Sequence, residues 1–82
     1  MNNYLPVSIF IIAQNEIDRI ERTIEAIRDL SDDIILVDSG STDGTPAKAA
    51  SLGVRVIHKA WQGYGLQKRF AEDQCRYNWL LI

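Results

Sequence analysis

Four stretches of the chain are short, continuous runs of mostly apolar residues. They are residues 7–13 (VSIFIIA), 33–37 (DIILV), 54–57 (VRVI) and 79–82 (WLLI). The first run, rich in β-branched side chains, is typical of a strand that is buried on both faces of a parallel sheet, and the second run is expected to be a buried strand as well. Pro6, directly before the first run, suits the start of a strand. The pattern therefore predicts four strands.

The segment after the first run repeats its apolar residues at helical spacing. The residues on this apolar face are Ile17, Ile20, Ile24 and Ile27. This spacing predicts an amphipathic helix of about 15 residues, with charged residues on its other face. We expect the helix to end near Leu30. We expect Asn15 to cap its N-terminus, because an asparagine side chain can accept a hydrogen bond from a free backbone N–H group.

Two further helices complete the pattern. Thr45 followed by Pro46 combines a capping hydroxyl with a proline at the first helical position, so a short helix is expected from Pro46 to Leu52. Gly53 suits the left-handed residue that ends such a helix. A third helix is expected over residues 66–75. Its expected inward-facing residues are Leu66, Phe70 and Ala71.

Strands that alternate with helices imply a parallel sheet with right-handed crossovers. The expected fold class is α/β, a Rossmann-like β-α-β-α-β-α-β unit. A length of 82 residues allows one small domain, which we expect to cover residues 1–82. Ligands of such sheets bind outside the carboxyl ends of the strands. The candidate site is therefore built from residues 13–16, 38–45 and 58–68.

Charge and composition exclude several classes of protein. The chain has 9 Lys and Arg residues against 11 Asp and Glu residues, so it has no basic surplus for nucleic acid or an anionic membrane. No apolar run approaches the roughly 20 residues that span a bilayer, and the N-terminus lacks the basic region of a secretory signal. The single cysteine, Cys75, excludes an intramolecular disulfide and a cysteine-rich zinc site. We therefore expect a cytoplasmic protein that binds no nucleic acid.

The segment 38–45 (DSGSTDGT) carries the densest polar chemistry. Asp38 ends a buried strand, where its carboxylate can accept hydrogen bonds from a ligand. Ser41 and Asp43 can bond the backbone of the loop and hold it rigid. Because these are also ordinary turn residues, a plain connection between strand and helix fits the pattern equally well. An EF-hand is excluded, since the third and fifth positions of the loop lack carboxylates.

Two more polar segments lie at the same expected edge of the sheet. Residues 14–16 (QNE) follow the first strand, where they face a ligand or serve only to begin the helix. Residues 63–68 (GYGLQK) resemble the start of a dinucleotide-binding fingerprint, but Lys68 stands where the third glycine is required. Lys68 can reach a phosphate, although a solvated helix face is the more ordinary role. Trp61 and Tyr64 are expected to be packing residues or loop anchors rather than a stacking platform.

Four motifs in order resemble the N-terminal part of family 2 glycosyltransferases of the GT-A fold. They are VSIFIIAQNE (7–16), IILVDSGSTDGT (34–45), GYGLQK (63–68) and WLLI (79–82). Within that family, the form of the second and third motifs is similar to the bacterial lipopolysaccharide-core β-1,4-glucosyltransferases. The resemblance covers nearly the whole chain. It implies that the chain is the truncated N-terminal, nucleotide-binding half of a GT-A domain.

The resemblance also implies which residues contact the nucleotide. In the family, the end of the first strand contacts the nucleoside, the aspartate after the second strand bonds the uracil ring, and a basic residue on the third helix approaches the nucleotide. The matching residues here are Gln14, Asn15, Glu16, Asp38 with its neighbour Ser39, and Lys68. The chain departs from the family pattern at Ile17, Arg69 and residues 76–78, and these departures bear on fine specificity.

The reaction that the resemblance implies is sugar transfer with inversion, of glucose from a UDP-sugar to a cell-envelope glycan such as the lipopolysaccharide core. In the family, a divalent metal (Mg or Mn) bound by an Asp-x-Asp motif neutralises the diphosphate leaving group. That motif would follow Ile82, so the metal is expected only for the parent enzyme. We expect no catalytic residue and no metal ligand in this chain. The chain by itself is therefore predicted to be inactive.

Two other functions are open to such a chain. A truncated gene product could act as a nucleotide-binding or interaction module without catalysis, and an exposed sheet would favour its self-association. A receiver-like signalling domain is disfavoured, because it needs clustered acidic residues at the first and third strand ends. Those ends carry residues 14–16 (QNE) and 58–59 (HK).

The parent enzyme could also work at the inner face of the cytoplasmic membrane.

Overall fold

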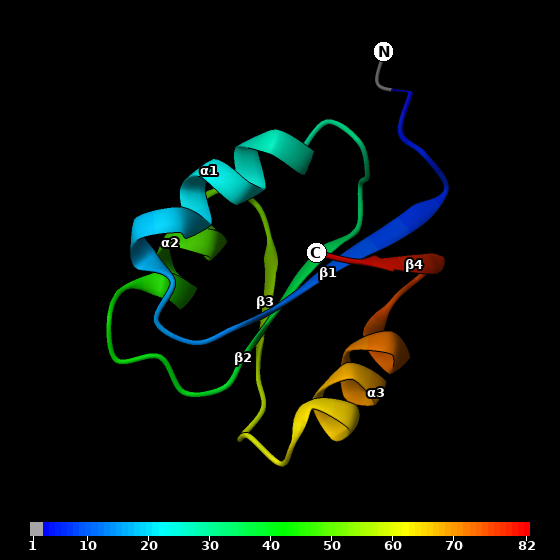
Figure 1. The fold of residues 1–82 in the computed structure, drawn as a ribbon. Helices are drawn as coiled ribbons and strands as arrows, with labels where there is room; N and C mark the ends of the chain where they lie inside the picture. The colour runs from blue at the N-terminus through cyan, green and yellow to red at the C-terminus, as the bar shows by residue number, and fades with distance from the viewer. Residues whose placement is uncertain (1–2) are drawn as a thin grey trace.

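The fold alternates strands and helices in the predicted order. A computed structural model describes residues 3–82, and Figure 1 shows the course of the chain. The elements are β1 (Val7–Ala13), α1 (Ile17–Ile27), β2 (Ile34–Asp38), α2 (Thr45–Ser51), β3 (Arg55–His58), α3 (Tyr64–Gln74) and β4 (Asn78–Leu81). The strands form one parallel sheet in the order β3-β2-β1-β4. The predicted α/β class is confirmed.

The central strands β1 and β2 carry the core on both of their faces. On one face, Ile9 and Leu36 pack against the isoleucines of α1 and against Ala49 of α2. On the other face, Phe10 packs against β2 and against Ala71 of α3. Figure 1 shows α1 and α2 together on one side of the sheet and α3 apart from them. A strand with helices on both faces has no solvent-facing side, which explains the unbroken apolar run of β1.

Several predicted boundaries differ from the structure. Helix α1 ends at Ile27, after which a tight turn forms with the N–H of Leu30 bonded to the carbonyl of Ile27. Helix α3 begins at Tyr64 rather than Leu66, and Leu66 is exposed rather than inward-facing. In α3 the buried polar residue Gln67 takes the inner position instead. The left-handed Gly53 (φ +88°) ends α2 as predicted.

The edge strand β4 is more exposed than its apolar sequence suggests. It pairs only with β1, and Trp79, Leu80 and Ile82 all remain exposed. The ring of Trp79 still contacts Phe10, at 5.4 Å between ring centroids. The prediction of a fourth parallel strand is thus correct, and its outer edge is open, because no other element among residues 3–82 pairs with it.

One carboxylate connects all four strands at their amino ends. Asp33 directly precedes β2 and is 2% exposed. It accepts hydrogen bonds from the hydroxyl of Ser8 in β1, from the guanidinium of Arg55 in β3 (3.0 Å), and from the backbone N–H of Arg76 before β4 (2.9 Å). The hydroxyl of Ser8 in turn accepts the N–H of Tyr77 (3.0 Å). These hydrogen bonds link residues at the amino ends of all four strands to one another.

The hydrogen bonds of this cluster also set the charge state of Asp33. Burial by itself would raise the pKa of Asp33. The hydrogen bonds from Ser8, Arg76 and Arg55 outweigh burial and hold the pKa below the ordinary value of 3.8. Asp33 is therefore ionised at neutral pH. Its carboxylate accepts hydrogen bonds from β1, from β3 and from the segment before β4.

Candidate functional site

The polar segments meet at the carboxyl ends of the strands, as the topology predicts. A cavity of about 660 Å³ opens there between the end of β1, the loop after β2 and the segment that leads into α3. Its lining residues are Ile12, Ala13, Gln14, Ser39, Trp61, Tyr64, Leu81 and Ile82. The wall is mostly apolar, with an amide and hydroxyls as its polar groups. This composition is typical of a small-molecule site.

Asp38 lies beneath the loop rather than in the cavity. It is 3% exposed, and its carboxylate accepts the backbone N–H groups of Gly40 (3.0 Å) and Ser41 (2.9 Å) together with the Ser41 hydroxyl. Gly40 has a φ of +109°, a conformation that glycine adopts without steric strain. Asp38 therefore shapes the loop, and the residue that lines the cavity is its neighbour Ser39, whose hydroxyl donates to the carbonyl of Ala13 (3.4 Å).

Asn15 joins the end of β1 to the same loop. Its backbone has a φ of 55°, a left-handed conformation that asparagine tolerates. Its N–H donates to the hydroxyl of Ser41 (2.8 Å), and its side-chain oxygen accepts the N–H of Thr42 (2.8 Å). The prediction that Asn15 caps α1 is therefore wrong, because its side chain is bonded to the loop instead.

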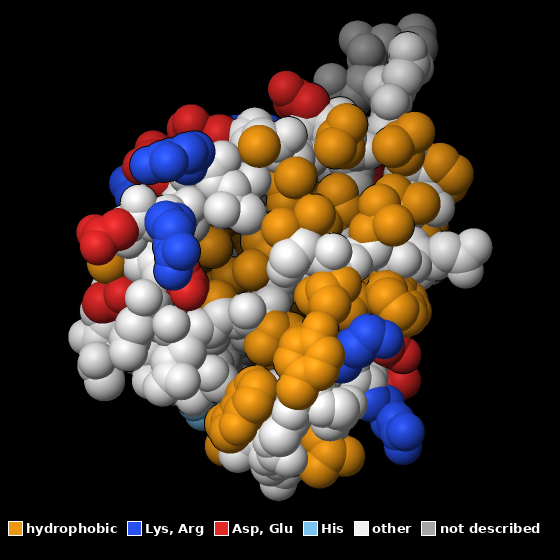
Figure 2. All heavy atoms as spheres, viewed as in Figure 1, with side chains coloured by type: hydrophobic (Ala, Val, Ile, Leu, Met, Phe, Trp, Pro, Cys, Tyr) orange, Lys and Arg blue, Asp and Glu red, His pale blue; other side chains and the backbone are white. Residues whose placement is uncertain are grey.

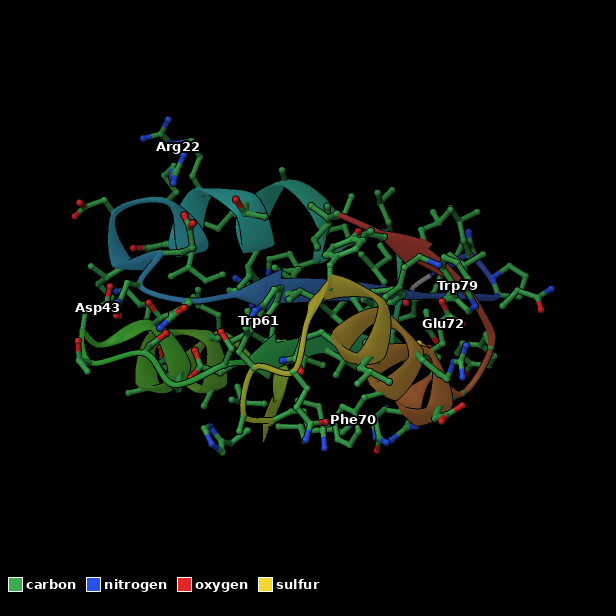
Figure 3. The ribbon with its side chains drawn as sticks, turned by 60° about the horizontal axis from the view of Figure 1, so that its bottom comes forward. Arg22, Asp43, Trp61, Phe70, Glu72 and Trp79 are labelled. Carbon is green, nitrogen blue, oxygen red and sulfur yellow. The ribbon has the colours of Figure 1, made fainter. Side chains whose placement is uncertain are left out.

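The cap of α1 comes from residues far away in the sequence. Asp43 accepts the N–H of Ile17 (3.2 Å), and the hydroxyl of Thr45 accepts the N–H of Glu16 (2.9 Å). Figure 3 shows Asp43 beneath the first turn of α1. The hydrogen bond from the Thr45 hydroxyl, the largest influence, lowers the pKa of Asp43. Thr45 is the first residue of α2, and its hydroxyl also bonds the N-terminus of α1. The 38–45 loop therefore connects the N-termini of the two helices through hydrogen bonds.

Glu16 and Lys68, like Asn15 and Asp38, lie outside the lining of the large cavity. Glu16 forms an ion pair with Arg19 (2.8 Å) on the surface beside a second cavity. Lys68 pairs with Glu72 one turn further along α3 (2.7 Å), and its ammonium lies 4.2 Å from the centroid of the Trp79 ring. These contacts place the Lys68 charge over β4. Among the six predicted residues, Gln14 and Ser39 line the cavity, and Asn15 and Asp38 organise its loop.

Trp61 and Tyr64 are the cavity residues whose role the sequence misjudged. They are 54% and 53% exposed, so they are not the packed anchors that we expected. Both line the cavity, and Figure 3 shows Trp61 on the segment between β3 and α3. The signal that could have identified them was their position: both lie in the short segment between His58, the end of a strand, and the next helix, where ligands of parallel sheets bind.

Residues 3–82 do not form a metal centre. Nowhere in this described part of the chain do three or more His, Cys, Asp or Glu side chains group together as metal ligands would. A helix long and apolar enough to cross a membrane is likewise not found among these residues. The arrangement as it stands can bind and orient a small organic molecule, and its residues do not fit a divalent cation.

Comparison with known proteins identifies the family. Residues 8–82 match the sequence model for Glycosyl transferase family 2. The chain belongs to glycosyl transferase family 2. This confirms the resemblance seen in the four sequence motifs. The cavity described above lies at the carboxyl ends of the strands, which is the edge where parallel α/β sheets bind their ligands.

Curated relatives of this family 2 chain come from bacteria. An uncharacterized glycosyltransferase of Rickettsia bellii is 49% identical over 75 residues, which cover 92% of this chain and 26% of the relative. The lipopolysaccharide core biosynthesis glycosyltransferase LpsC of Rhizobium meliloti is 41% identical over 80 residues, covering 92% of this chain and 29% of the relative. The chain thus spans between a quarter and a third of the length of these relatives.

Solved structures show the same fold. Glucosyl-3-phosphoglycerate synthase from Mycobacterium tuberculosis, in complex with Mn²⁺, UDP and glucosyl-3-phosphoglycerate, aligns with a TM-score of 0.82 and 28% identity over 93% of this chain and 32% of that protein. The same enzyme has been crystallised with Mn²⁺, UDP-glucose and phosphoglyceric acid, again with a TM-score of 0.82. A divalent metal therefore accompanies the sugar nucleotide in a glycosyltransferase that shares this fold.

Proposed function

We propose that this chain is the nucleotide-binding part of a family 2 glycosyltransferase that transfers glucose from UDP-glucose to a cell-envelope glycan such as the lipopolysaccharide core. The observation that carries the proposal is the cavity at the carboxyl ends of β1 and β2, lined by two exposed aromatic rings and by Gln14 and Ser39. Its volume of about 660 Å³ lies within the usual range for small-molecule sites, roughly 300–1,000 Å³.

The cavity offers a nucleoside two kinds of contact. The rings of Trp61 and Tyr64 supply flat apolar surfaces for a pyrimidine, and one stacked base contributes about 1–3 kcal/mol. The amide of Gln14 can donate and accept, and the hydroxyl of Ser39 can do the same, so they can pair with the edge of a uracil ring or with ribose hydroxyls. In this proposal, Asn15 and Asp38 hold the loop that places Ser39.

The cavity lining also shows which end of a sugar nucleotide it suits. The lining residues include no Lys or Arg, so the cavity has no cation for a diphosphate. We therefore assign it to the base and ribose, with the phosphates directed outward. Glu16 and Lys68 contact the nucleotide in this scheme only if their present ion pairs with Arg19 and Glu72 open.

The donor and the acceptor are supported by the relatives. Glucosyl-3-phosphoglycerate synthase was crystallised with UDP-glucose, which supports UDP-linked glucose as the donor. LpsC, at 41% identity, is named for lipopolysaccharide core biosynthesis, which supports that acceptor. The single cysteine favours a reducing compartment, so we propose that the protein works in the cytoplasm.

A binding experiment tests the proposal. The purified chain should bind UDP in isothermal titration calorimetry. It should bind ADP more weakly, because Gln14 and Ser39 are proposed to pair with the edge of a uracil ring. The affinity should be the same with Mn²⁺ and with EDTA, since residues 3–82 form no metal centre. Incubation with UDP-glucose and a lipopolysaccharide core acceptor should give no transfer by the chain alone.

A matched pair of serine variants makes the test specific to the cavity. Ser39→Ala should weaken UDP binding by about fivefold to tenfold, because one hydrogen bond contributes about 1 kcal/mol. Ser51→Ala, on the exposed face of α2, should leave the affinity unchanged. A folded chain that does not bind UDP at millimolar concentration would overturn the proposal.

A second candidate function is a non-catalytic interaction module that self-associates. The observation that favours it is the apolar surface over β4 and the start of α3, which Figure 2 shows as a continuous gathering of hydrophobic side chains. The exposed members on the strand side are Trp79, Leu80 and Ile82. An unpaired strand edge next to such a surface favours pairing between copies. Sedimentation equilibrium should then show dimers that Leu80→Lys converts to monomers, and a monomeric wild-type chain would refute this candidate.

A further inference from the structure

Gln67 is a buried polar residue that the proposed function does not use. It lies on the inner side of α3 and is 0% exposed. Its side-chain amide nitrogen donates to the carbonyl of Lys59 (2.9 Å), while its amide oxygen is buried and has no hydrogen-bond partner among residues 3–82. A buried amide with an unpaired oxygen destabilises a fold relative to an apolar side chain of the same size. A glutamine that is present in spite of this cost is a candidate for a functional role.

The hydrogen bonds of Gln67 close a short loop at both of its ends. The side-chain amide nitrogen donates to the carbonyl of Lys59 at the start of the loop, which is the bond specific to glutamine. The backbone N–H makes the ordinary helical bond to the carbonyl of Gly63 at the end of the loop (3.1 Å). The N–H of Lys59 is itself bonded to the carbonyl of Asp38 (2.9 Å). A single residue therefore clamps the segment 59–63 between the end of β2 and the first turn of α3.

Trp61 stands in the middle of this clamped segment. Its ring is 54% exposed, so it has too little packing of its own to fix its position. Gly63, with a φ of +100° and no atom within 4 Å of its missing side chain, adds backbone freedom at the end of the loop. The position of Trp61 at the cavity is thus determined mainly by the backbone, and Gln67 is the residue that fixes that backbone.

We propose that Gln67 is a positioning residue that holds Trp61 at the wall of the cavity and so prepares the surface on which the nucleotide base stacks. This inference rests on the proposed nucleotide site for its ligand, but the clamp itself does not depend on any ligand. Gln67 acts through Trp61 and is not itself in the lining of the cavity.

The first test measures the clamp in the free protein. The chain has 2 Trp residues, so in a Trp79→Phe background the fluorescence reports Trp61 alone. Gln67→Met, of similar length but without the amide, should lower the anisotropy of Trp61 and increase its quenching by acrylamide, while the far-UV circular dichroism stays the same. Gln74→Met, at the other end of α3, is the matched control and should change neither. An unchanged Trp61 signal in Gln67→Met would overturn the inference.

The second test measures the coupling between the two residues in UDP binding. Trp61→Ala and Gln67→Met should each weaken UDP binding, by between about fivefold and a hundredfold for the loss of a stacked base. If Gln67 acts through Trp61, the double variant should bind no more weakly than Trp61→Ala. A general structural role would instead give additive losses, and additivity would overturn the inference.

The two tests separate the inference from the proposed function. A wild-type chain that does not bind UDP refutes the nucleotide site, yet the fluorescence test still decides whether Gln67 holds Trp61. If Gln67→Met does not fold, a measurement on the unmutated chain decides instead. Nuclear magnetic resonance should detect the scalar coupling from the Gln67 side-chain nitrogen across the hydrogen bond to the Lys59 carbonyl carbon. Its absence would overturn the clamp.

Discussion

Replacement of Asp33 should destabilise the whole sheet, because this buried carboxylate is bonded to three strands. In Asp33→Ala, the fully buried hydroxyl of Ser8 and the backbone N–H of Arg76 lose their acceptor. A buried donor left without a partner, such as the Ser8 hydroxyl, costs about 1–3 kcal/mol, and the part-buried N–H of Arg76 adds a smaller loss because water can reach it. The guanidinium of Arg55 also loses this acceptor, but it keeps its bond to the carbonyl of Gln74 (2.6 Å), and its side chain is 39% exposed, so water compensates most of the loss. We therefore expect a loss of about 3 kcal/mol.

The loss should be large relative to the stability of the domain. At roughly 0.05–0.15 kcal/mol per residue, a chain of 82 residues has a total stability of about 4–12 kcal/mol. Urea unfolding followed by far-UV circular dichroism is a suitable assay. With a urea dependence near 1 kcal/mol per molar, the midpoint should fall by about 3 M.

The neighbouring residue provides the control. Asp32 is exposed, and its contact with the Tyr77 hydroxyl is 3.4 Å long, so Asp32→Ala should change the stability by less than about 0.5 kcal/mol. If Asp33→Ala unfolds at the same urea concentration as Asp32→Ala, the buried cluster does not stabilise the sheet and this reasoning is wrong.

Three further predictions follow from single contacts. Acid should destabilise the protein, because the folded-state pKa values of Asp33 and Asp43 lie below 3.8, their value in the unfolded chain. The stability that the two carboxylates contribute is complete above pH 3.8 and is lost as the pH falls through the folded-state pKa values. A melting temperature that is constant from pH 5 to pH 2 would contradict this. Gly53→Ala should cost about 1–2 kcal/mol in thermal unfolding through its φ of +88°, whereas Gly65→Ala inside α3 should be neutral or stabilising; equal melting temperatures would argue against backbone strain. Asn15→Gly keeps the left-handed backbone but loses the side-chain bond to the loop, so it should cost about 1 kcal/mol and speed amide exchange in that loop; unchanged exchange would show that the bond does not order it.

The elements with a strong internal pattern were predictable from the sequence. The isoleucines of α1 are spaced for one buried face, and Ile20, Ile24 and Ile27 are indeed buried. Strand β1 is an unbroken apolar run and is covered on both faces. In both cases the signal lies within one element, so no knowledge of the neighbouring elements was needed.

The contacts made across the sequence were not predictable in the same way. Asn15 has the composition of a helix cap, but the loop after β2 supplies that cap through Asp43, 26 residues away from Ile17. Trp61 looked like a packing residue because large aromatic side chains are usually covered, but it is 54% exposed. Asp38 was placed at the ligand because it ends a buried strand, and the bonds of its carboxylate to its own loop, at Gly40 and Ser41, could not be read from that position.

The sheet order has a consequence for how the protein folds as it is synthesised. Strand β1 pairs with β2 across short separations, as in Ile9 with Ile34, but it pairs with β4 across most of the chain, as in Val7 with Asn78. Closing the longer loop costs about 1 kcal/mol more in chain entropy, so the pairing of β1 with β2 should form first. On the ribosome, the central strand therefore keeps one unpaired side until the chain has emerged as far as Leu81.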